Sequence, residues 1–427
     1  MTLIPCTGGR NHFPPRTACL GWSGPSGNCS LAAASRHFRE DLLLHGGGGL
    51  PQLGSRVPAI VTSNLVAPVG PAGNIAHLRR VALDVNTAVP LSVLDLCPVP
   101  TGVPTAEALR RSVDLARHAE QWGFGRYWVA EHHNMAGIAS SAPAVLVGQI
   151  ASATSTMRVG SGGVMLPNHA PMVVAEQFGM LEAMYPGRID LGIGRAPGTD
   201  RLTARALQRN FDTLSVEPFP EELAQLRAYF EGPVDDGRPP RRSRAIPAEG
   251  NVPVVWLLGS SGYSAELAGS LGLPFAFAHH FSAANTLPAL RLYRRAFRPS
   301  VVLAEPYCLI SVSVVCASDS ERAHWLHGST RLFSLRLRTG HPSTLPSPEE
   351  AAEYPYTAAE QAVIDQATGS HIVGDQATVL EALATLAART GVDELMVVTS
   401  TYGHADRLAS YELLAHPAAP QNIGSIA

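Results

Sequence analysis

Polar and glycine-rich residues follow the predicted strands of this chain, where packing alone would favour branched apolar side chains. The strand-end residues, in chain order, are Asp95; Glu131-His132-His133-Asn134; Ser161-Gly162-Gly163; Gly192 to Arg195; Gly259-Ser260-Ser261-Gly262; and His279-His280. Imidazole titrates near neutral pH and also binds metals. The two histidine pairs therefore raise three alternatives, which are acid/base chemistry, a metal site and structural packing.

The spacing within each histidine pair disfavours a metal site. Adjacent residues on a strand point to opposite faces, so His132 and His133 share a face only where the chain has already turned. The same holds for His279 and His280. The six cysteines form no CxxC pair, which excludes a zinc cassette. We therefore predict no metal site and keep an acid/base role and a structural role open for the histidines.

Arg195 and the turn at Gly259–Gly262 together predict a phosphate-binding site. A guanidinium at the end of the fourth predicted strand suits a phosphate group. The Gly/Ser turn leads into a predicted helix from Tyr263, and the first N–H groups of a helix can bind an anion. The alternatives are a surface salt bridge for Arg195 and an ordinary helix cap by Ser260 or Ser261.

Two glycine patterns receive different interpretations. Gly192 to Gly198 has the spacing GxGxxxG, contains Pro197 and follows the fourth strand, so we reject a dinucleotide-binding fingerprint. Gly162 and Gly163 end the third predicted strand. Paired glycines cost a strand stability, but they leave room for a flat ligand and permit unusual backbone geometry. We predict that a ligand approaches the backbone at this second pair.

Apolar segments alternate with helical patterns along most of the chain. Eight segments are predicted to be strands: Leu91–Cys97, Tyr127–Ala130, Met157–Met165, Ile189–Gly194, Val254–Leu258, Phe275–Ala278, Cys308–Val315 and Glu394–Thr399. Nearly continuous apolar strands with helical connections indicate a parallel sheet. Eight such units predict an α/β fold of the (β/α)₈ TIM barrel type, whose active site lies at the C-terminal strand ends. A doubly wound sheet remains the competing architecture.

Helices are predicted between these strands, and one connection is unusually long. The predicted helices cover residues 104–121, 143–153, 172–184, segments within 201–230, a helix from 263, 285–297 and 377–388. Residues 332–371 lie between strands seven and eight and contain polar, proline-containing loops. A connection of this length can form a lid over the site.

The overall composition narrows the class of protein. The chain has 427 residues, of which 45% are hydrophobic, and a net charge of −3, which suits a globular protein and gives no sign of binding nucleic acid. No uninterrupted apolar run of about 18 residues predicts a membrane span, and we expect a cytoplasmic protein. All 32 basic residues are arginine, which excludes Schiff-base lysine chemistry and a Walker P-loop.

Residues 1–86 differ in composition from the rest and are predicted to be disordered. They are rich in Gly, Pro and Ser and show no sustained periodicity. Up to Leu83 the only acidic residues are Glu40 and Asp41. An acid-poor, arginine-containing segment resembles a transit peptide, but we favour the interpretation that the start codon is assigned too far upstream. We expect the folded domain to span residues 87–427.

The strand-end residues together resemble the bacterial luciferase-like flavin monooxygenases. The resemblance runs from about Leu91 to Tyr411. Its most specific blocks are Glu131–Asn134, Val159–His169 and Tyr185–Arg195. The resemblance implies a barrel that binds reduced FMN at the mouth formed by the C-terminal strand ends.

The resemblance also implies roles for single residues. His132 corresponds to the catalytic histidine near the flavin, and Gly162-Gly163 corresponds to a non-proline cis peptide behind the flavin ring. Arg195 corresponds to a phosphate-binding arginine, and Ser260 with the adjoining backbone corresponds to a second phosphate contact. The residues expected to bind the cofactor are Asn134, Gly162, Gly163, Arg195, Gly259, Ser260, Ser261 and Tyr263.

The chemistry implied by the resemblance is oxygen insertion. FMNH₂ would react with O₂ to form a C4a-peroxyflavin that oxygenates a small organic substrate such as an aldehyde or a secondary-metabolite intermediate, and His132 would move a proton. A separate NAD(P)H:flavin reductase would supply FMNH₂, and a homodimer is expected because family members are often dimers. Gly194 and Gly259 replace a reactive cysteine and a glutamate of luciferase, which argues against light emission. The alternatives are an F420-dependent oxidoreductase and a non-catalytic flavin-binding protein.

Overall fold

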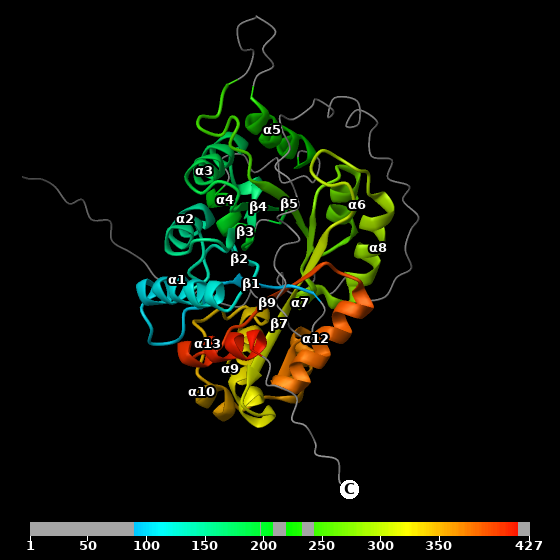
Figure 1. Ribbon diagram of the computed structural model, residues 1–427. Coiled ribbons are helices and arrows are strands. Elements are labelled where there is room, and N and C mark those ends of the chain that lie inside the picture. Colours follow the sequence, from blue (N-terminus) through cyan, green and yellow to red (C-terminus); the bar gives the residue numbers. More distant parts are fainter. Residues whose placement is uncertain (1–88, 197, 208–218, 233–242, 417–427) are drawn as a thin grey trace, which may run out of the picture. The chain divides into compact units, whose positions relative to one another are not determined.

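Eight parallel strands close into a barrel at the centre of the computed structural model (Figure 1). The structure describes residues 89–196, 198–207, 219–232 and 243–416, so the extension predicted over residues 1–86 lies outside it. The barrel strands are β1 (Leu91–Asp95), β2 (Arg126–Val129), β3 (Arg158–Met165), β4 (Ile189–Gly194), β5 (Val254–Gly259), β6 (Phe275–Phe277), β7 (Cys308–Ala317) and β9 (Glu394–Val398). Each strand from β1 to β7 pairs with the next, β7 pairs with β9, and β9 pairs with β1. The predicted (β/α)₈ TIM barrel is confirmed.

Helices surround the barrel (Figure 1). Their bounds are α1 (Thr105–Gln121), α2 (Pro143–Ala153), α3 (Pro171–Met184), α4 (Arg201–Leu207), α5 (Phe219–Glu231), α6 (Gly262–Ser270), α7 (His279–Ser282), α8 (Thr286–Ala296), α9 (Ser320–Arg338), α10 (Pro348–Glu353), α11 (Ala358–Thr368), α12 (Gln376–Thr390) and α13 (His404–Ala415), with 3₁₀ helices η3 (Leu166–Asn168) and η5 (Ala283–Asn285). Within these described ranges, none of the helices combines the length and hydrophobicity that crossing a membrane requires.

The predicted strand limits lie within two residues of those in the structure, and the first strand shows one cause of the differences. β1 ends at Asp95 rather than at Cys97. Cys97 has a φ of 52°, in the left-handed region, so the chain has left the extended conformation although the sequence is still apolar. The predicted strand Tyr127–Ala130 begins and ends one residue earlier in the structure, as β2.

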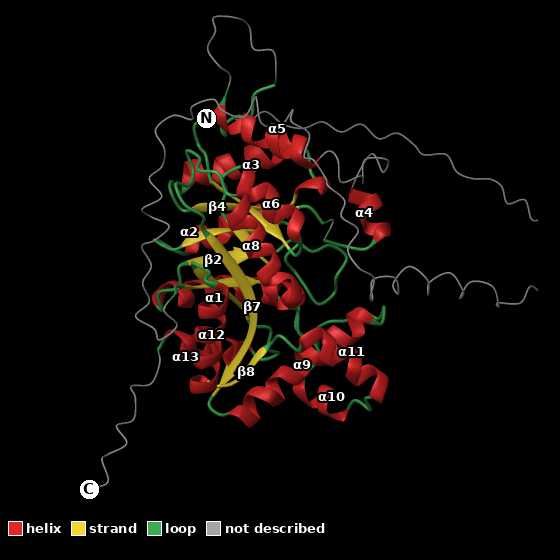
Figure 2. Ribbon diagram, turned by 90° about the vertical axis from the view of Figure 1, so that its right-hand side faces the viewer, coloured by secondary structure: helices red, strands yellow, loops and turns green. Residues whose placement is uncertain are grey.

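The long connection after β7 lies where it was predicted, but it is largely helical rather than made of loops. It contains the end of α9, then α10 and α11, and a short strand, β8 (Ile372–Asp375). Figure 2 shows β8 beside the far end of β7, with α9, α10 and α11 grouped nearby. Many of its polar residues are helix caps, because Ser347 accepts the N–H of Glu350 and Thr357 forms a capping box with Glu360.

Apolar side chains fill the barrel interior and the layer between strands and helices. Inside the barrel, Trp256 packs edge-to-face against Trp128 and Tyr307, with ring centroids 5.1 and 5.7 Å apart. The layer between strands and helices is larger and includes the buried Leu115 of α1 and Phe178 of α3. Burial on both faces explains why the strands appear in the sequence as nearly continuous apolar runs.

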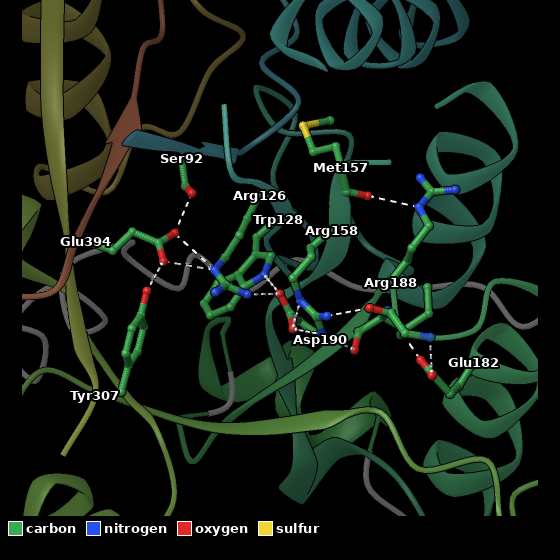
Figure 3. A network of polar contacts seen from close by, with 12 residues as sticks. Ser92, Arg126, Trp128, Met157, Arg158, Glu182, Arg188, Asp190, Tyr307 and Glu394 are labelled. Atoms are coloured by element: carbon green, nitrogen blue, oxygen red, sulfur yellow. Dashed lines mark hydrogen bonds and ion pairs between the residues drawn. The ribbon is translucent and has the colours of Figure 1, made fainter. Parts of the chain in front are cut away.

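A buried network of charges lies at the N-terminal end of the barrel interior (Figure 3). Arg126, at the start of β2, lies 2.9 Å from Asp190 of β4 and 3.0 Å from Glu394 of β9. Arg158, at the start of β3, pairs with Asp190 at 2.6 Å, and Trp128 donates to the same carboxylate at 3.0 Å. Burial alone would raise the pKa of Asp190, but Arg158 and Arg126 outweigh burial and hold that pKa below its usual value.

Candidate functional site

A cavity of about 550 Å³ opens at the C-terminal ends of the barrel strands. Residues from the strands or from the loops that follow them line it, and so do residues of the connection after β7. Most of the lining is apolar, for example Leu94, Trp128, Met396, Phe333 and Leu337. This end of the barrel is opposite the charge network, and it is where enzymes with this fold carry their active sites.

His132 faces the cavity and His133 does not. β2 ends at Val129, so both histidines lie beyond the strand, where the chain has turned. His132 lines the cavity. His133 turns toward the buried carboxylate of Glu131, and its Nε2 lies 2.9 Å from Oε1 of that residue. Only the first histidine of the pair can therefore contact a bound molecule.

Glu131, the residue directly before His132, joins two loops. Its carboxylate accepts hydrogen bonds from His133 and His169 at 2.9 Å, from the Asn168 side chain at 3.1 Å and from the backbone N–H of Met165 at 3.0 Å. Burial opposes ionisation, but His169 and these other donors hold the pKa of Glu131 below its usual value. The residue directly before His132 is therefore an ionised anchor between the loops after β2 and β3.

The two nitrogens of the His132 ring have different surroundings. Nδ1 is buried and has no hydrogen-bonding partner among the described residues. A buried N–H without a partner costs more than a buried lone pair, so the neutral ring keeps its proton on Nε2. Burial lowers the pKa of His132, against the opposing attraction of Glu131, which favours the neutral ring at neutral pH.

Arg195 and the start of α6 form a corner of the cavity that suits an anion. Arg195 follows β4, and its guanidinium carbon lies 4.3 Å from the ring centre of Tyr263. The guanidinium has no ion-pair partner within the ranges described. Ser261 occupies the N-cap of α6, and no side chain caps that helix. Both the guanidinium and the first N–H groups of α6 are thus available to a ligand phosphate.

The glycine pair of β3 has the backbone geometry that the resemblance implied. The peptide bond between Gly162 and Gly163 is cis. Gly162 lines the cavity, and a Cβ atom on it would come within 2.7 Å of Leu94 and 3.1 Å of Trp128. Any side chain at this position would therefore displace the apolar wall beside it.

Three of the expected cofactor-binding residues do not line the cavity. Asn134 is exposed, has a φ of 56°, and donates to Asp200 at 3.2 Å. Tyr263 approaches the site only through its contact with Arg195. Gly163 packs closely against β4, because a Cβ atom on it would lie 2.7 Å from the backbone oxygen of Gly192. In contrast, Gly259, Ser260 and Ser261 all line the cavity, as do Gly162, Arg195 and His132.

Asp95, the first residue of the strand-end series, has a structural role. It is fully buried and pairs with Arg407 at 2.5 Å, and the hydroxyl of Tyr127 donates to it at 2.5 Å. It does not line the cavity. Within the described ranges, no group of three or more His, Cys, Asp or Glu side chains could hold a metal ion.

Residues 89–394 match the protein family described as luciferase-like monooxygenase. The chain belongs to this family. A luciferase-like monooxygenase of Escherichia coli (strain K12) is 45% identical over 329 residues, which are 77% of this chain and 96% of the relative. The N-acetyl-S-alkylcysteine monooxygenase of Bacillus subtilis (strain 168) is 35% identical over 327 residues, 76% of this chain and 97% of the relative. The crystal structure of apo-MsnO8 has a TM-score of 0.71 and 40% identity, and covers 77% of this chain and 97% of that one.

More distant structures share the fold of this chain. The oxygenating constituent of 3,6-diketocamphane monooxygenase, solved with FMN, has a TM-score of 0.58 at 17% identity. An F420-dependent secondary alcohol dehydrogenase, solved with an F420–acetone adduct, has a TM-score of 0.54 at 15% identity. They cover 78% and 76% of this chain and 98% of each structure. Because one structure holds FMN and the other an F420 adduct, the fold alone does not select the cofactor.

Several cavity residues were either left without a predicted role or not predicted at all from the sequence. His280 lines the cavity, whereas His279 turns away to lie 2.8 Å from the Thr286 hydroxyl. His371 and Phe333 reach the cavity from the connection after β7. The His279-His280 pair gave a signal that could not be resolved from the sequence. His371 gave none, because its position depends on how the helices before it pack.

Proposed function

We propose that this luciferase-like monooxygenase uses reduced FMN and O₂ to oxygenate a small, largely apolar organic molecule. The observation that carries the proposal is that the anion-binding corner at Arg195 and the histidine His132 face one apolar cavity. A phosphate on a flat redox cofactor suits the corner, and proton transfer suits the histidine. Membership of a monooxygenase family supports the same interpretation.

The residues that line the cavity fit the parts of FMN. Arg195 and the backbone N–H groups at Ser260 and Ser261 would bind the phosphate, because these residues line the cavity and no described side chain caps α6. Gly162 would lie against the ring, because it presents no side chain on the cavity floor. Tyr263 would hold the Arg195 side chain in place through their stacking contact. Reduced FMN, when bound, would supply the electrons for the reaction with O₂.

The protein itself would then exclude water and move a proton. Phe333 and Leu337 of α9 contribute apolar walls on the side of the long connection. The N–H at Nε2 of His132 is the group that would give a proton to a bound molecule, because Nδ1 is buried. Glu131 anchors the backbone directly before His132 through its contacts with the loop after β3.

The proposed reaction needs a source of FMNH₂ and an organic substrate. FMNH₂ would come from a separate NAD(P)H:flavin reductase, because the sequence carries no dinucleotide-binding fingerprint. The named activity of the Bacillus subtilis relative makes N-acetyl-S-alkylcysteines the first substrates to test, followed by aldehydes. We also propose that the protein forms a homodimer and is cytoplasmic.

Arg195→Gln is expected to weaken FMN binding by about 10- to 100-fold and to leave riboflavin binding unchanged. The loss corresponds to one charge-assisted contact with a phosphate, about 1.5–3 kcal/mol. Riboflavin lacks the phosphate, so it measures whether the ring pocket is intact. Fluorescence titration of both flavins checks the prediction. Arg336→Gln is the matched control, since Arg336 pairs with Glu350 at 2.7 Å away from the cavity.

Oxygen labelling tests the reaction itself. The protein is supplied with FMNH₂ from a flavin reductase, N-acetyl-S-alkylcysteines or aldehydes, and ¹⁸O₂. We expect a product that carries one labelled oxygen atom, detected by mass spectrometry. Turnover with reduced F420 in the absence of O₂ would contradict the proposal and favour the deazaflavin alternative. Flavin binding with no oxygenated product from any substrate would favour a non-catalytic flavin-binding protein.

A further inference from the structure

A second arginine, Arg338, lines the cavity from the last turn of α9. Its side chain is exposed and forms no ion pair or hydrogen bond within the described ranges. The other arginines of α9 each pair with a carboxylate: Arg322 with Asp406, Arg331 with Asp365 and Arg336 with Glu350. Arg338 is thus the arginine of this helix whose charge is left for a bound molecule.

Ser334 adds a hydroxyl group beside Arg338. The two residues are four apart on α9, so their side chains lie on one face of the helix, and both line the cavity. Thr330, one turn earlier, donates its hydroxyl proton to the backbone oxygen of Ser400 at 2.8 Å. The hydroxyl of Ser334 has no such partner among the described residues. This face of α9 therefore offers a cation and a hydroxyl to the cavity.

The cavity contains no acidic side chain that could neutralise Arg338. Among the described residues that line it, Arg195 and Arg338 are the two arginines, and none is Asp or Glu. Phe333 and Leu337 provide apolar walls next to Arg338. An unpaired guanidinium at an apolar cavity attracts anions. If a cofactor phosphate occupies Arg195, Arg338 still lacks a counter-charge.

Arg338 lies across the mouth of the barrel from the phosphate corner. That corner is formed by the end of β4 and by α6, which follows β5. In the closed ring of strands, β1 is reached from β5 in four steps in either direction, so β1 and β5 face each other. The segment that contains Arg338 packs on the β1 side.

Two contacts, one on each side of Arg338 in the chain, place it there. A Cβ atom on Gly137, in the loop after β2, would lie 2.5 Å from the ring of Phe333. Leu345 pairs through its backbone with Pro100, in the loop after β1. FMN carries one phosphate, which cannot occupy both sides of the mouth. The anion that suits Arg338 therefore belongs to a second molecule.

We propose that Arg338, with Ser334 beside it, binds a carboxylate of the substrate, whose apolar part lies against Phe333 and Leu337. A guanidinium can donate two parallel hydrogen bonds to a carboxylate, and the serine hydroxyl can donate a further one. This inference rests on the proposed function and narrows its substrate class to small organic acids with an apolar body. Arg338 is thereby a specificity-determining residue.

Calorimetric titration of two acids, each compared with its uncharged amide, tests this role. The acids are N-acetyl-S-butylcysteine and 4-butylbenzoate, and they are titrated into the full-length protein saturated with FMN. Arg338→Gln is expected to weaken binding of at least one acid about three- to tenfold, since a contact at an exposed position is weaker than a buried one. Binding of the amides is expected to stay unchanged. Arg338→Lys keeps the charge and is expected to lose less affinity.

Arg336→Gln is the matched control, because it removes the same charge from the same helix away from the cavity. Both acids should bind this variant as they bind the unaltered protein. An equal loss in Arg336→Gln would assign the effect to general charge. Unchanged acid binding in Arg338→Gln would leave Arg338 a role only at the end of α9. Either result would overturn the inference.

FMN affinity, measured on the same variants, separates a substrate contact from a cofactor contact. Arg338→Gln is expected to bind FMN as the unaltered protein does. Weakened FMN binding in this variant would assign Arg338 to the flavin and overturn the inference, and so would failure of both acids to bind the unaltered protein. If the unaltered protein does not bind FMN, the proposed function fails, and the acids titrated into the flavin-free variants still test Arg338 against Arg336.

Discussion

His132→Gln is expected to lower the turnover of the FMNH₂-supplied enzyme by about 10²- to 10⁴-fold, the range for loss of one acid/base group. Only Nε2 of His132, which carries the proton of the neutral ring, can give a proton to a bound molecule, because Nδ1 is buried. Glutamine keeps a polar end of similar reach but does not titrate. The measurement is the rate of substrate oxygenation at saturating FMNH₂, with FMN affinity determined on the same preparation.

Flavin affinity decides how the His132→Gln result is interpreted. We expect FMN affinity to match that of the unaltered protein, since the phosphate contacts lie at Arg195 and α6. His324→Gln is the matched control, because His324 is exposed on α9 and contacts only the backbone oxygen of Ser320. Unchanged turnover in His132→Gln with intact FMN binding would show that another group handles the proton.

Asp190→Asn is expected to lower the free energy of unfolding by about 3–5 kcal/mol. Asp190 is fully buried and neutralises both Arg126 and Arg158 at the N-terminal end of the barrel. Its loss would leave the buried Arg126 with Glu394 alone and would remove the ion-pair partner of the partly buried Arg158. Urea denaturation measures the change. Asp365→Asn, which removes an exposed partner of Arg331, is expected to have little effect.

The destabilisation by Asp190→Asn should depend on pH with a definite sign. The pKa of Asp190 in the folded protein is lowered, so its ionised form stabilises the fold. That contribution is complete above the unfolded pKa, about 4, and disappears as the pH falls through the folded value. The difference in unfolding free energy between the two proteins should therefore shrink below about pH 4. A difference that stays constant into acid would contradict an electrostatic role for Asp190.

The apolar barrel strands could be predicted from the sequence more accurately than the other parts of the fold. β4 has the predicted bounds, because a strand buried on both faces appears as an apolar run that ends at glycine. β8 was not predicted, since three of its four residues are only partly buried and the strand pairs with one end of β7. α13 was also missed, although its buried Tyr411 and Leu414 have helical spacing.

The candidate site could be predicted in outline but not in orientation. Parallel strands bring their C-terminal ends to one mouth, so the sequence could name His132 and Arg195 as neighbours of one cavity. Which histidine of each pair faces inward depends on the turn after the strand, and that turn selects His132 in one case and His280 in the other. Asn134 was expected at the cofactor, but its left-handed backbone conformation places it at Asp200.

Anaerobic titration of the purified protein with FMNH₂ tests the central claim most directly. The claim is that the corner at Arg195 and α6 binds the phosphate of a reduced flavin. We predict saturable binding of one FMNH₂ per chain, with reduced riboflavin bound about 10- to 100-fold more weakly because it lacks the phosphate. Equal affinity for the two reduced flavins, or binding of reduced F420 with none of FMNH₂, would contradict it.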